Sequence, residues 1–315
     1  MKHLSISLFA VLVSAVFTGC THKDLCFDHT HTLDVEVVYD WRNATDANPA
    51  SMELYLFDVK TNETTRFNFQ GRDGGPIRIG ANTYDAIGFN SDLTDWARFR
   101  NTSDVSTFEI YTDDAAALSA YNLDPLAVPR AEGSGQERMA LTPGMIWNDC
   151  EENVTVKSGV DKQIITLYPE EAVCHYTVTV RDIENAQYLN GSELDGTLSG
   201  MSESYLHGQK SASDSRVTMP FVLYSSDGLT LHSSFLTFGE SPQTKYPHIL
   251  TIYMMLTDGS KWYTTYDVSD QIYNAPDPKH VNIVVSGLKL PKPISSGGFL
   301  PSVNDWQDIQ VDITM

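Results

Sequence analysis

Apolar and polar side chains alternate one by one along much of this chain. The clearest runs are Leu33–Trp41, Met52–Leu56, Val173–Val180 and Ile309–Met315. Successive side chains of a strand point to opposite faces, so this alternation predicts half-buried strands, and helical periodicity is nearly absent. Many short strands separated by Gly, Pro and Asp turns predict an all-β fold made of β-sandwiches.

Local patterns refine this prediction. Ile249–Leu256 and Trp262–Val268 flank an Asp-Gly turn, which predicts a hairpin, and Val281–Val285 is expected to continue the same meander. Two short segments are predicted to be helical, Leu93–Phe99 and Ala115–Ala120, the second because it follows an acidic pair that suits a helix start.

The N-terminus has the pattern of an export signal. Residues 1–19 are MKHLSISLFAVLVSAVFTG, with a short basic start, an apolar run from Leu4 to Phe17 and small residues directly before Cys20. A run of about 14 residues is too short to span a bilayer, which needs about 20. The sequence therefore predicts a lipoprotein signal peptide, cleaved before Cys20, whose thiol would carry lipid. The alternative is an ordinary secreted protein with a chance cysteine at that position.

Length and composition suggest how the mature chain is divided. Removing residues 1–19 from the 315-residue chain leaves 296 (315 − 19), which suits two domains. The weakest segment is Lys157–Gln163, which we expect to separate two sandwiches. The predicted division is 1–19 signal peptide, 20–31 lipid-anchored lead, 32–157 N-terminal β-sandwich, 158–290 C-terminal β-sandwich, and 291–315 Pro/Gly linker and terminal strand.

The C-terminus combines a flexible lead with a strand. Pro291–Pro301 holds three prolines and two glycines, which is the composition of a linker. The amphipathic strand after it can pair within its own domain or complete the sheet of another subunit. The sequence leaves both possibilities open.

Charge and cysteine content limit the partners. The chain has 21 basic and 41 acidic side chains and a net charge of −20, which makes nucleic acid a poor partner. Besides Cys20 it has Cys26, Cys150 and Cys174. A bridge between Cys150 and Cys174 is left open, since Cys174 also has the phase of a small buried residue. The sequence has no CxxC pair and no suitably spaced histidine, so we expect no metal site.

No catalytic motif is present, and we expect neither an enzyme nor a cofactor. His29 and His31 could share one face of a strand as metal ligands, but flanking the first strand explains them more simply. The acidic pairs that could suggest a glycosidase are those expected by chance in so acidic a chain; they are Asp113-Asp114, Glu151-Glu152 and Glu170-Glu171. The aromatic residues that could bind a sugar are Tyr253, Trp262, Tyr263, Tyr266 and Tyr273, although core packing is the simpler interpretation.

Several segments resemble a known family. They are Cys20–His31, the strand ending at Trp41, Met52–Phe57, Ile164–Pro169, Val173–Val180 and Leu198–Tyr205. Together they are similar to a family of Bacteroidales lipoproteins related to the fimbrillin-like anchor and accessory subunits of FimB and Mfa type. The resemblance implies two tandem transthyretin-like β-sandwich domains, an outer-membrane lipid anchor and a place in a type V pilus. Lys23-Asp24 resembles the charged signal that sends such lipoproteins to the cell surface.

The expected function follows from these points. We expect a lipid-anchored structural, anchor or accessory subunit of a type V fimbria or related surface assembly, located at the outer membrane and exposed on the cell surface. Its partners would be membrane lipid, through acylated Cys20, and other fimbrial subunits. The alternatives are a surface adhesin or glycan-binding lipoprotein and, third, a hydrolase, which would need a pocket with two facing carboxylates.

Overall fold

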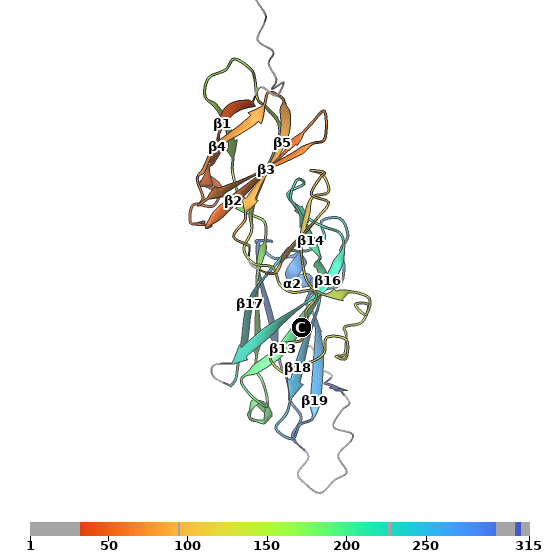
Figure 1. Ribbon diagram of the computed structural model, residues 1–315. Helices are drawn as coiled ribbons and strands as arrows, with labels where there is room; N and C mark the ends of the chain where they lie inside the picture. Colours follow the sequence, from red (N-terminus) through yellow and green to blue (C-terminus); the bar gives the residue numbers. More distant parts are fainter. Residues whose placement is uncertain (1–31, 94, 226–227, 294–305, 310–315) are drawn as a thin grey trace, which may run out of the picture.

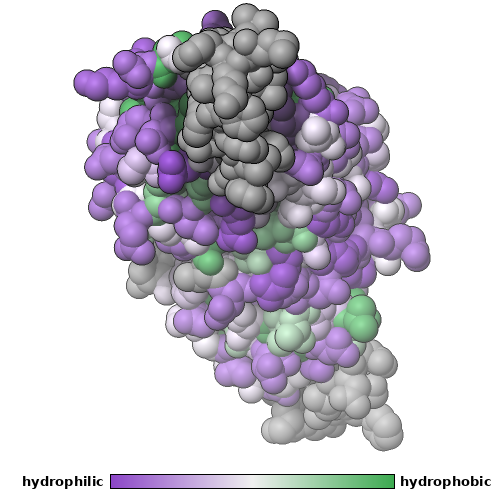
Figure 2. Space-filling model, turned by 45° about the horizontal axis from the view of Figure 1, so that its top comes forward, coloured by the Kyte–Doolittle hydropathy of each residue, from purple (hydrophilic) through white to green (hydrophobic). Residues whose placement is uncertain are grey.

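The computed structural model describes residues 32–93, 95–225, 228–293 and 306–309 (Figure 1). These residues form strands and turns almost throughout, which confirms the all-β prediction. The helical elements within them are short: α2 (Ser269–Tyr273) and the 3-10 turns η1 (Trp41–Asn43) and η2 (Ala186–Tyr188). None of the described helices is long and apolar enough to cross a membrane. The face of the molecule shown in Figure 2 is largely hydrophilic, with small apolar areas between polar side chains.

The first group of strands is a β-sandwich. Its three-stranded sheet has the order β10–β1–β4, with β1 (Thr32–Tyr39), β4 (Gly74–Gly80) and β10 (Gln163–Leu167). Its five-stranded sheet has the order β11–β9–β5–β2–β3, with β2 (Ser51–Asp58), β3 (Thr64–Gln70), β5 (Thr83–Asn90), β9 (Trp147–Thr155) and β11 (Glu170–Glu171). Val35 and Val37 of β1 and Met52 and Leu54 of β2 are at most 1% exposed and belong to one core, so the two sheets face each other.

The second group of strands forms one larger sheet. Its order is β20–β12–β17–β16–β13–β18–β19–β21, and β8 (Arg138–Met139) pairs with β16. The strands are β12 (Cys174–Arg181), β13 (Glu193–Ser202), β16 (Arg216–Ser225), β17 (Leu231–Thr237), β18 (Ile249–Met255), β19 (Lys261–Asp267), β20 (His280–Ser286) and β21 (Trp306–Asp308).

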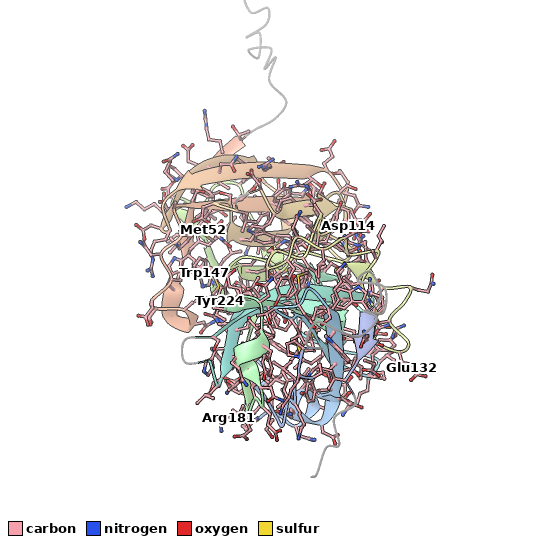
Figure 3. The ribbon with its side chains drawn as sticks, turned by 90° about the horizontal axis from the view of Figure 1, so that it is seen from below. Met52, Asp114, Glu132, Trp147, Arg181 and Tyr224 are labelled. Atoms are coloured by element: carbon pink, nitrogen blue, oxygen red, sulfur yellow. The ribbon has the colours of Figure 1, made fainter. Side chains whose placement is uncertain are left out.

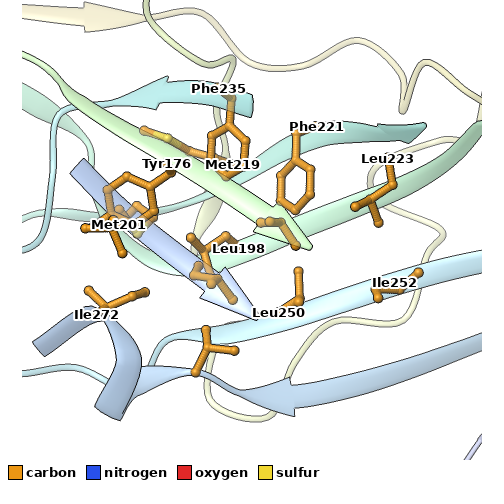
Figure 4. Packing of buried hydrophobic residues seen from close by; sticks show 14 of the residues in the cluster. Tyr176, Leu198, Met201, Met219, Phe221, Leu223, Phe235, Leu250, Ile252 and Ile272 are labelled. Atoms are coloured by element: carbon orange, nitrogen blue, oxygen red, sulfur yellow. The ribbon is translucent and has the colours of Figure 1, made fainter. Parts of the chain in front are cut away.

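This large sheet folds into two layers. β16 pairs with β17 only through Tyr224–His232 and Ser225–Leu231, so β20–β12–β17 can turn over the other strands. Tyr176 of the first layer packs in the same core as Leu198 and Leu250 of the second (Figure 4). The second group is therefore also a β-sandwich.

The two groups share one pattern of strand pairing. In each, the first strand pairs in parallel with the last strand of its layer and antiparallel with a third: β1 with β10 and β4, and β12 with β20 and β17. The second layer runs β3–β2–β5–β9 in the first group and β16–β13–β18–β19 in the second. An additional strand then occupies the same edge, β11 beside β9 and β21 beside β19.

A smaller sheet links the groups. It has the order β15–β14–β7–β6, with β6 (Ala97–Arg100), β7 (Glu109–Thr112), β14 (Ser204–Leu206) and β15 (Ser211–Ala212). β14 lies between the strands labelled β1–β5 and those labelled β16–β19 (Figure 1). In Figure 3, Met52 marks the first group, Arg181 the second, and Trp147 of β9 lies between them.

The boundary between the two groups differs from the one predicted at residues 157–158. β10 pairs with β1, and β11 pairs with β9, so residues 163–171 stay with the first group. The parallel pairing of β1 and β10 joins residues that lie more than a hundred positions apart, and no local pattern signals it. We propose that the groups are two domains and that the first ends at Glu171.

Three local predictions were wrong. Leu93–Phe99 does not form a helix, since residues 97–100 form β6. Ala115–Ala120 is turn structure in which Leu118, 1% exposed, bridges to Leu123. So short a segment cannot sustain a helix alone, and burial of Leu118 decides its conformation. Val281–Val285 lies in β20, which pairs with β12 in the other layer instead of continuing the β18–β19 hairpin.

Candidate functional site

The candidate site is the edge of β19, where β21 lies. The two strands are parallel, with Lys261 opposite Trp306 and Tyr263 opposite Asp308. The Ile309 N–H donates to the Tyr263 carbonyl at 2.9 Å, and the Thr264 hydroxyl donates to the Ile309 carbonyl at 3.0 Å. A short strand from the C-terminal segment thus occupies a sheet edge of the second group.

Trp306 holds this strand on the outer face of the sheet. Its ring meets the Tyr253 ring edge to face, with centroids 5.5 Å apart, and the Lys261 ammonium lies 5.9 Å from the Trp306 ring centroid. Tyr253 is fully buried, and its hydroxyl donates to the Pro129 carbonyl at 2.6 Å. Burial raises the pKa of Tyr253 above its usual value, so this hydroxyl stays a donor.

Most of the side chains against which Trp306 packs come from the segment between β7 and β9. Ala115, Leu118, Val128 and Met139 form a small buried cluster with Tyr253, and Trp306 packs against it. This long connection, which runs from the linking sheet to β9 of the first group, therefore builds part of the surface on which the C-terminal strand lies. Ile309 packs on the main core of the second group, as the predicted apolar face requires. Val311, Ile313 and Met315, the rest of that face, lie outside the described residues.

Another edge of the same group is blocked by a side chain. Gln271 of α2 donates its amide to the Val284 carbonyl at 3.0 Å and accepts the Val284 N–H at 2.8 Å. These two bonds occupy main-chain groups on the outer side of β20. A side-chain amide thereby protects this edge from pairing with another strand.

The aromatic residues of the predicted sugar patch are dispersed. Tyr253 and Tyr266 are buried at 0% and 3% exposure, and Trp262 packs against the main core. Tyr263 joins the cluster beneath Trp306, and the Tyr273 hydroxyl donates to the Tyr246 carbonyl at 2.6 Å. Core packing accounts for this set, and the five do not form one exposed patch.

The acidic pairs take part in several different contacts. Asp113 pairs with Arg98 and Asp114 with Arg138, each at 2.5 Å. Glu151 and Glu170 line one open cleft of about 340 Å³ together with Arg42, Asn43, Asp149, Tyr168 and Lys210. Asp149, the buried carboxylate there, accepts from the Lys210 ammonium at 3.0 Å and from the Tyr168 N–H at 2.6 Å. This carboxylate is thus committed to structural hydrogen bonds.

The remaining predicted site residues fall into two sets. Cys20, the predicted lipidation site, lies outside the described residues, as do Cys26, His29 and His31. Cys150 and Cys174 are free buried thiols. Burial raises the pKa of Cys150 to about 12 and raises that of Cys174 as well, so neither is a reactive thiolate near neutral pH.

Comparison with known proteins identifies the family to which the chain belongs. A family model described as Domain of unknown function (DUF5119) matches residues 19–222. The chain belongs to this family. No curated protein matches the chain.

Two solved structures share the fold of this DUF5119 protein. A candidate adhesin from Bacteroides ovatus is 17% identical, with a TM-score of 0.63 over 87% of this chain and 99% of that one. The fimbrial anchor protein Mfa2 from Porphyromonas gingivalis is 12% identical, with a TM-score of 0.50 over 81% of this chain and 90% of that one. The expected likeness to Bacteroidales fimbrillin-like proteins is confirmed at the level of the fold.

Proposed function

We propose that this protein is a lipid-anchored structural subunit, anchor or accessory, of a type V fimbria or a related cell-surface assembly. The observation that carries the proposal is β21, a three-residue strand that occupies the edge of β19 and is anchored by Trp306. The fold shared with a candidate adhesin and with the fimbrial anchor protein Mfa2 supports it. In this proposal the protein does no catalysis, and other fimbrial subunits are its partners.

The β19 edge is the place where a subunit would join. Main-chain hydrogen bonds along a sheet edge give affinity without regard to sequence, and side-chain pockets beside the edge give specificity. Trp306 on its apolar cluster supplies such a pocket. In this proposal β21 leaves the β19 edge during assembly and pairs with the sheet edge of a partner subunit, so removal of β21 prevents joining.

The anchor is the second part of the proposal. Cys20 would be acylated after cleavage of residues 1–19, and the lead 20–31 would connect the lipid to β1. Two or three acyl chains hold a protein stably on a membrane, because each buried methylene contributes about 0.8 kcal/mol. In this proposal the protein lies at the outer membrane and is exposed on the cell surface.

The anchor is tested by Cys20→Ser, with Cys26→Ser as the matched control. We expect Cys20→Ser to release the protein into the soluble fraction and to abolish incorporation of a labelled fatty acid. Cys26→Ser should keep both. Continued membrane association of the Cys20→Ser variant, with no lipid on the wild type, would disprove the anchor.

Assembly is tested by deleting residues 305–315. We expect a folded, membrane-anchored protein that no longer joins its partner subunits, measured by co-purification of the surface assembly. Loss of folding in the isolated protein would instead assign β21 to closing its own domain.

The alternative function is a glycan-binding adhesin. The five aromatic residues of the predicted sugar patch do not form one exposed surface, which argues against glycan binding there. A glycan array with the purified protein separates the two, since a structural subunit binds its partner chains and gives no array signal.

A further inference from the structure

Three potential metal ligands meet where the two groups of strands join. Glu171 is the last residue of β11, His175 lies in β12, and His280 begins β20. One ligand atom from each residue lies within 4.8 Å of the other two. His175 and His280 are direct partners in the parallel β12–β20 ladder, and their rings stack with centroids 4.9 Å apart.

His280 is oriented in the way that metal-binding histidines are. Its Nδ1 lies 2.8 Å from Asp277 Oδ2, and the Lys279 N–H donates to Asp277 Oδ1 at 2.9 Å. A histidine that donates Nδ1–H to a carboxylate keeps the lone pair of Nε2 for a metal, and the carboxylate raises the basicity of that nitrogen. Asp277 thus acts as a positioning residue for His280.

His175 has an unsatisfied nitrogen. Its Nε2 is shielded from solvent and has no hydrogen-bond partner, although Glu171 Oε2 lies 3.4 Å away. A buried polar atom without a partner costs free energy, and a bound cation would use this lone pair. The Glu171 carboxylate would then serve as the third ligand.

We propose that Glu171, His175 and His280 bind a divalent transition-metal ion of the Zn²⁺ class. Two imidazoles and one carboxylate are a zinc ligand set, and a water would complete the tetrahedron. Imidazole nitrogen favours zinc, copper and nickel over calcium and magnesium. Zn–N bonds of about 2.0–2.1 Å place ligand atoms about 3.4 Å apart, so the three side chains close in on the ion.

The surroundings allow that contraction. The Glu171, His175 and His280 side chains are 36%, 34% and 57% exposed, so they can rotate without disturbing a core. The Lys279 ammonium, which donates to the Glu171 carbonyl at 2.8 Å, opposes the charge of the metal. Asp277 and the Glu171 carboxylate offset it, and the net charge of −20 favours cations in general.

A metal here would join the two groups of strands. Glu171 pairs with Trp147 of β9 in the first group, while both histidines belong to the second. Between them Ala172 and Val173 are at most 1% exposed, and the Ala172 N–H donates to the Ile146 carbonyl at 2.9 Å. An ion bound across this short buried connection would restrict movement of one group against the other.

The experiment is a titration of the full chain with Zn²⁺ in competition with a chromophoric chelator, and with Co²⁺ for its tetrahedral absorption. We expect one ion per chain and no competition from Ca²⁺ or Mg²⁺. His175→Gln, His280→Gln and Glu171→Gln should each abolish this binding. Asp277→Asn, which changes the hydrogen-bond partner of His280 Nδ1, should weaken it about 10–100-fold.

Two controls make the result specific. His232→Gln removes an exposed histidine from the same face of the neighbouring strand, where His232 Nδ1 lies 3.3 Å from the Thr179 hydroxyl, and should bind zinc as the wild type does. The double variant His29→Gln/His31→Gln tests the N-terminal histidines and should also bind. Unchanged binding in the three cluster variants, with circular dichroism showing that they fold, would overturn the proposal. Loss of binding only in the N-terminal double variant would overturn it equally.

Discussion

Asn148 and His207 hold each other through two hydrogen bonds at the junction of the two groups of strands. His207 Nδ1 donates to Asn148 Oδ1 at 2.7 Å, and the Asn148 amide donates back to the His207 carbonyl at 3.1 Å. Asn148 lies in β9 of the first group, and His207 follows β14 directly. The His207 ring also stacks on Phe89 of β5 at 4.5 Å, so a fully buried imidazole connects the two groups.

This arrangement predicts a loss of stability in mild acid. Burial lowers the pKa of His207 to about 3, against about 6.5 in the unfolded chain. Below pH 6.5 the unfolded chain therefore binds a proton that the folded chain does not, and stability falls as the pH falls from 6.5 toward 3. We expect His207 to contribute a loss of about 1.4 kcal/mol at pH 5.5 relative to neutral pH. Urea unfolding at a series of pH values measures it.

The matched variants isolate His207 from other titrating groups. His207→Gln should be less stable at pH 7 by about 1–3 kcal/mol, because the buried contacts are imperfectly replaced. Its unfolding free energy should depend on pH less steeply than that of the wild type between pH 6.5 and 5. His248, whose pKa burial also lowers, remains in the variant and leaves a residual slope. A slope in His207→Gln equal to that of the wild type would refute the assignment.

Trp306→Ala tests how β21 is held. The substitution removes the contacts with Tyr253 and Lys261 but leaves the main-chain pairing possible. We expect the unfolding free energy to drop by about 1–2 kcal/mol, since a half-buried aromatic ring is lost. The C-terminal segment should become sensitive to limited proteolysis while the rest of the chain stays resistant. Gln307→Ala, the neighbour on the other face, should digest like the wild type; equal resistance of Trp306→Ala would show that the pairing alone holds β21.

Local patterns were sufficient for part of this fold. The β18–β19 hairpin follows from two alternating runs around an Asp-Gly turn, and Gly259 has the positive φ of 82° that the turn requires. Val173–Val180 likewise becomes β12, because its β-branched residues suit a strand in any context. These signals lie within a few residues of one another.

Contacts between distant residues could not be predicted in this way. The strands that pair in parallel with β1 and β12 are β10 and β20, which lie far along the chain from them. The sequence of a strand does not indicate which other strand it pairs with. The same limit applies to the metal-ligand cluster. Glu171 and His175 are four residues apart, but His280 is over a hundred positions away and reaches them only through the β12–β20 register. A search for ligands with short spacing therefore finds His29 and His31 and misses this set.

The cysteines give a third prediction. Cys150 and Cys174 are buried thiols whose pKa values burial raises, so the thiolate that reacts with alkylating agents is scarce. We expect iodoacetamide at pH 8 to leave both unmodified in the folded protein and to modify both in urea without reductant. Peptide mass spectrometry reads out each site separately. Modification of either thiol without denaturant would contradict the packing described here, and a requirement for reductant would reveal a disulfide.

Two glycines, one in each core, test whether the groups are separate domains. A Cβ at Gly88 of β5 would lie 2.7 Å from Tyr39 Cε1 and 2.8 Å from Leu167 Cδ2. A Cβ at Gly196 of β13 would lie 2.7 Å from Phe221 Cε2, and the Phe221 ring is stacked at 4.3 Å on Phe235. Neither position leaves room for a methyl group, so we expect Gly88→Ala and Gly196→Ala each to cost about 1–3 kcal/mol through overpacking.

The location of the damage is the informative result. If the groups are domains, Gly88→Ala should raise amide hydrogen exchange in β1–β5 and leave β12, β17 and β18 protected, and Gly196→Ala should do the reverse. Gly135→Ala is the matched control, because a Cβ there meets nothing within 4 Å and its φ is not positive; its exchange should equal that of the wild type. The shared β7–β14 sheet and the Asn148–His207 pair resist separation of the groups. Faster exchange in both groups from either substitution would therefore mean that they unfold as one unit and that the proposed division at Glu171 is wrong.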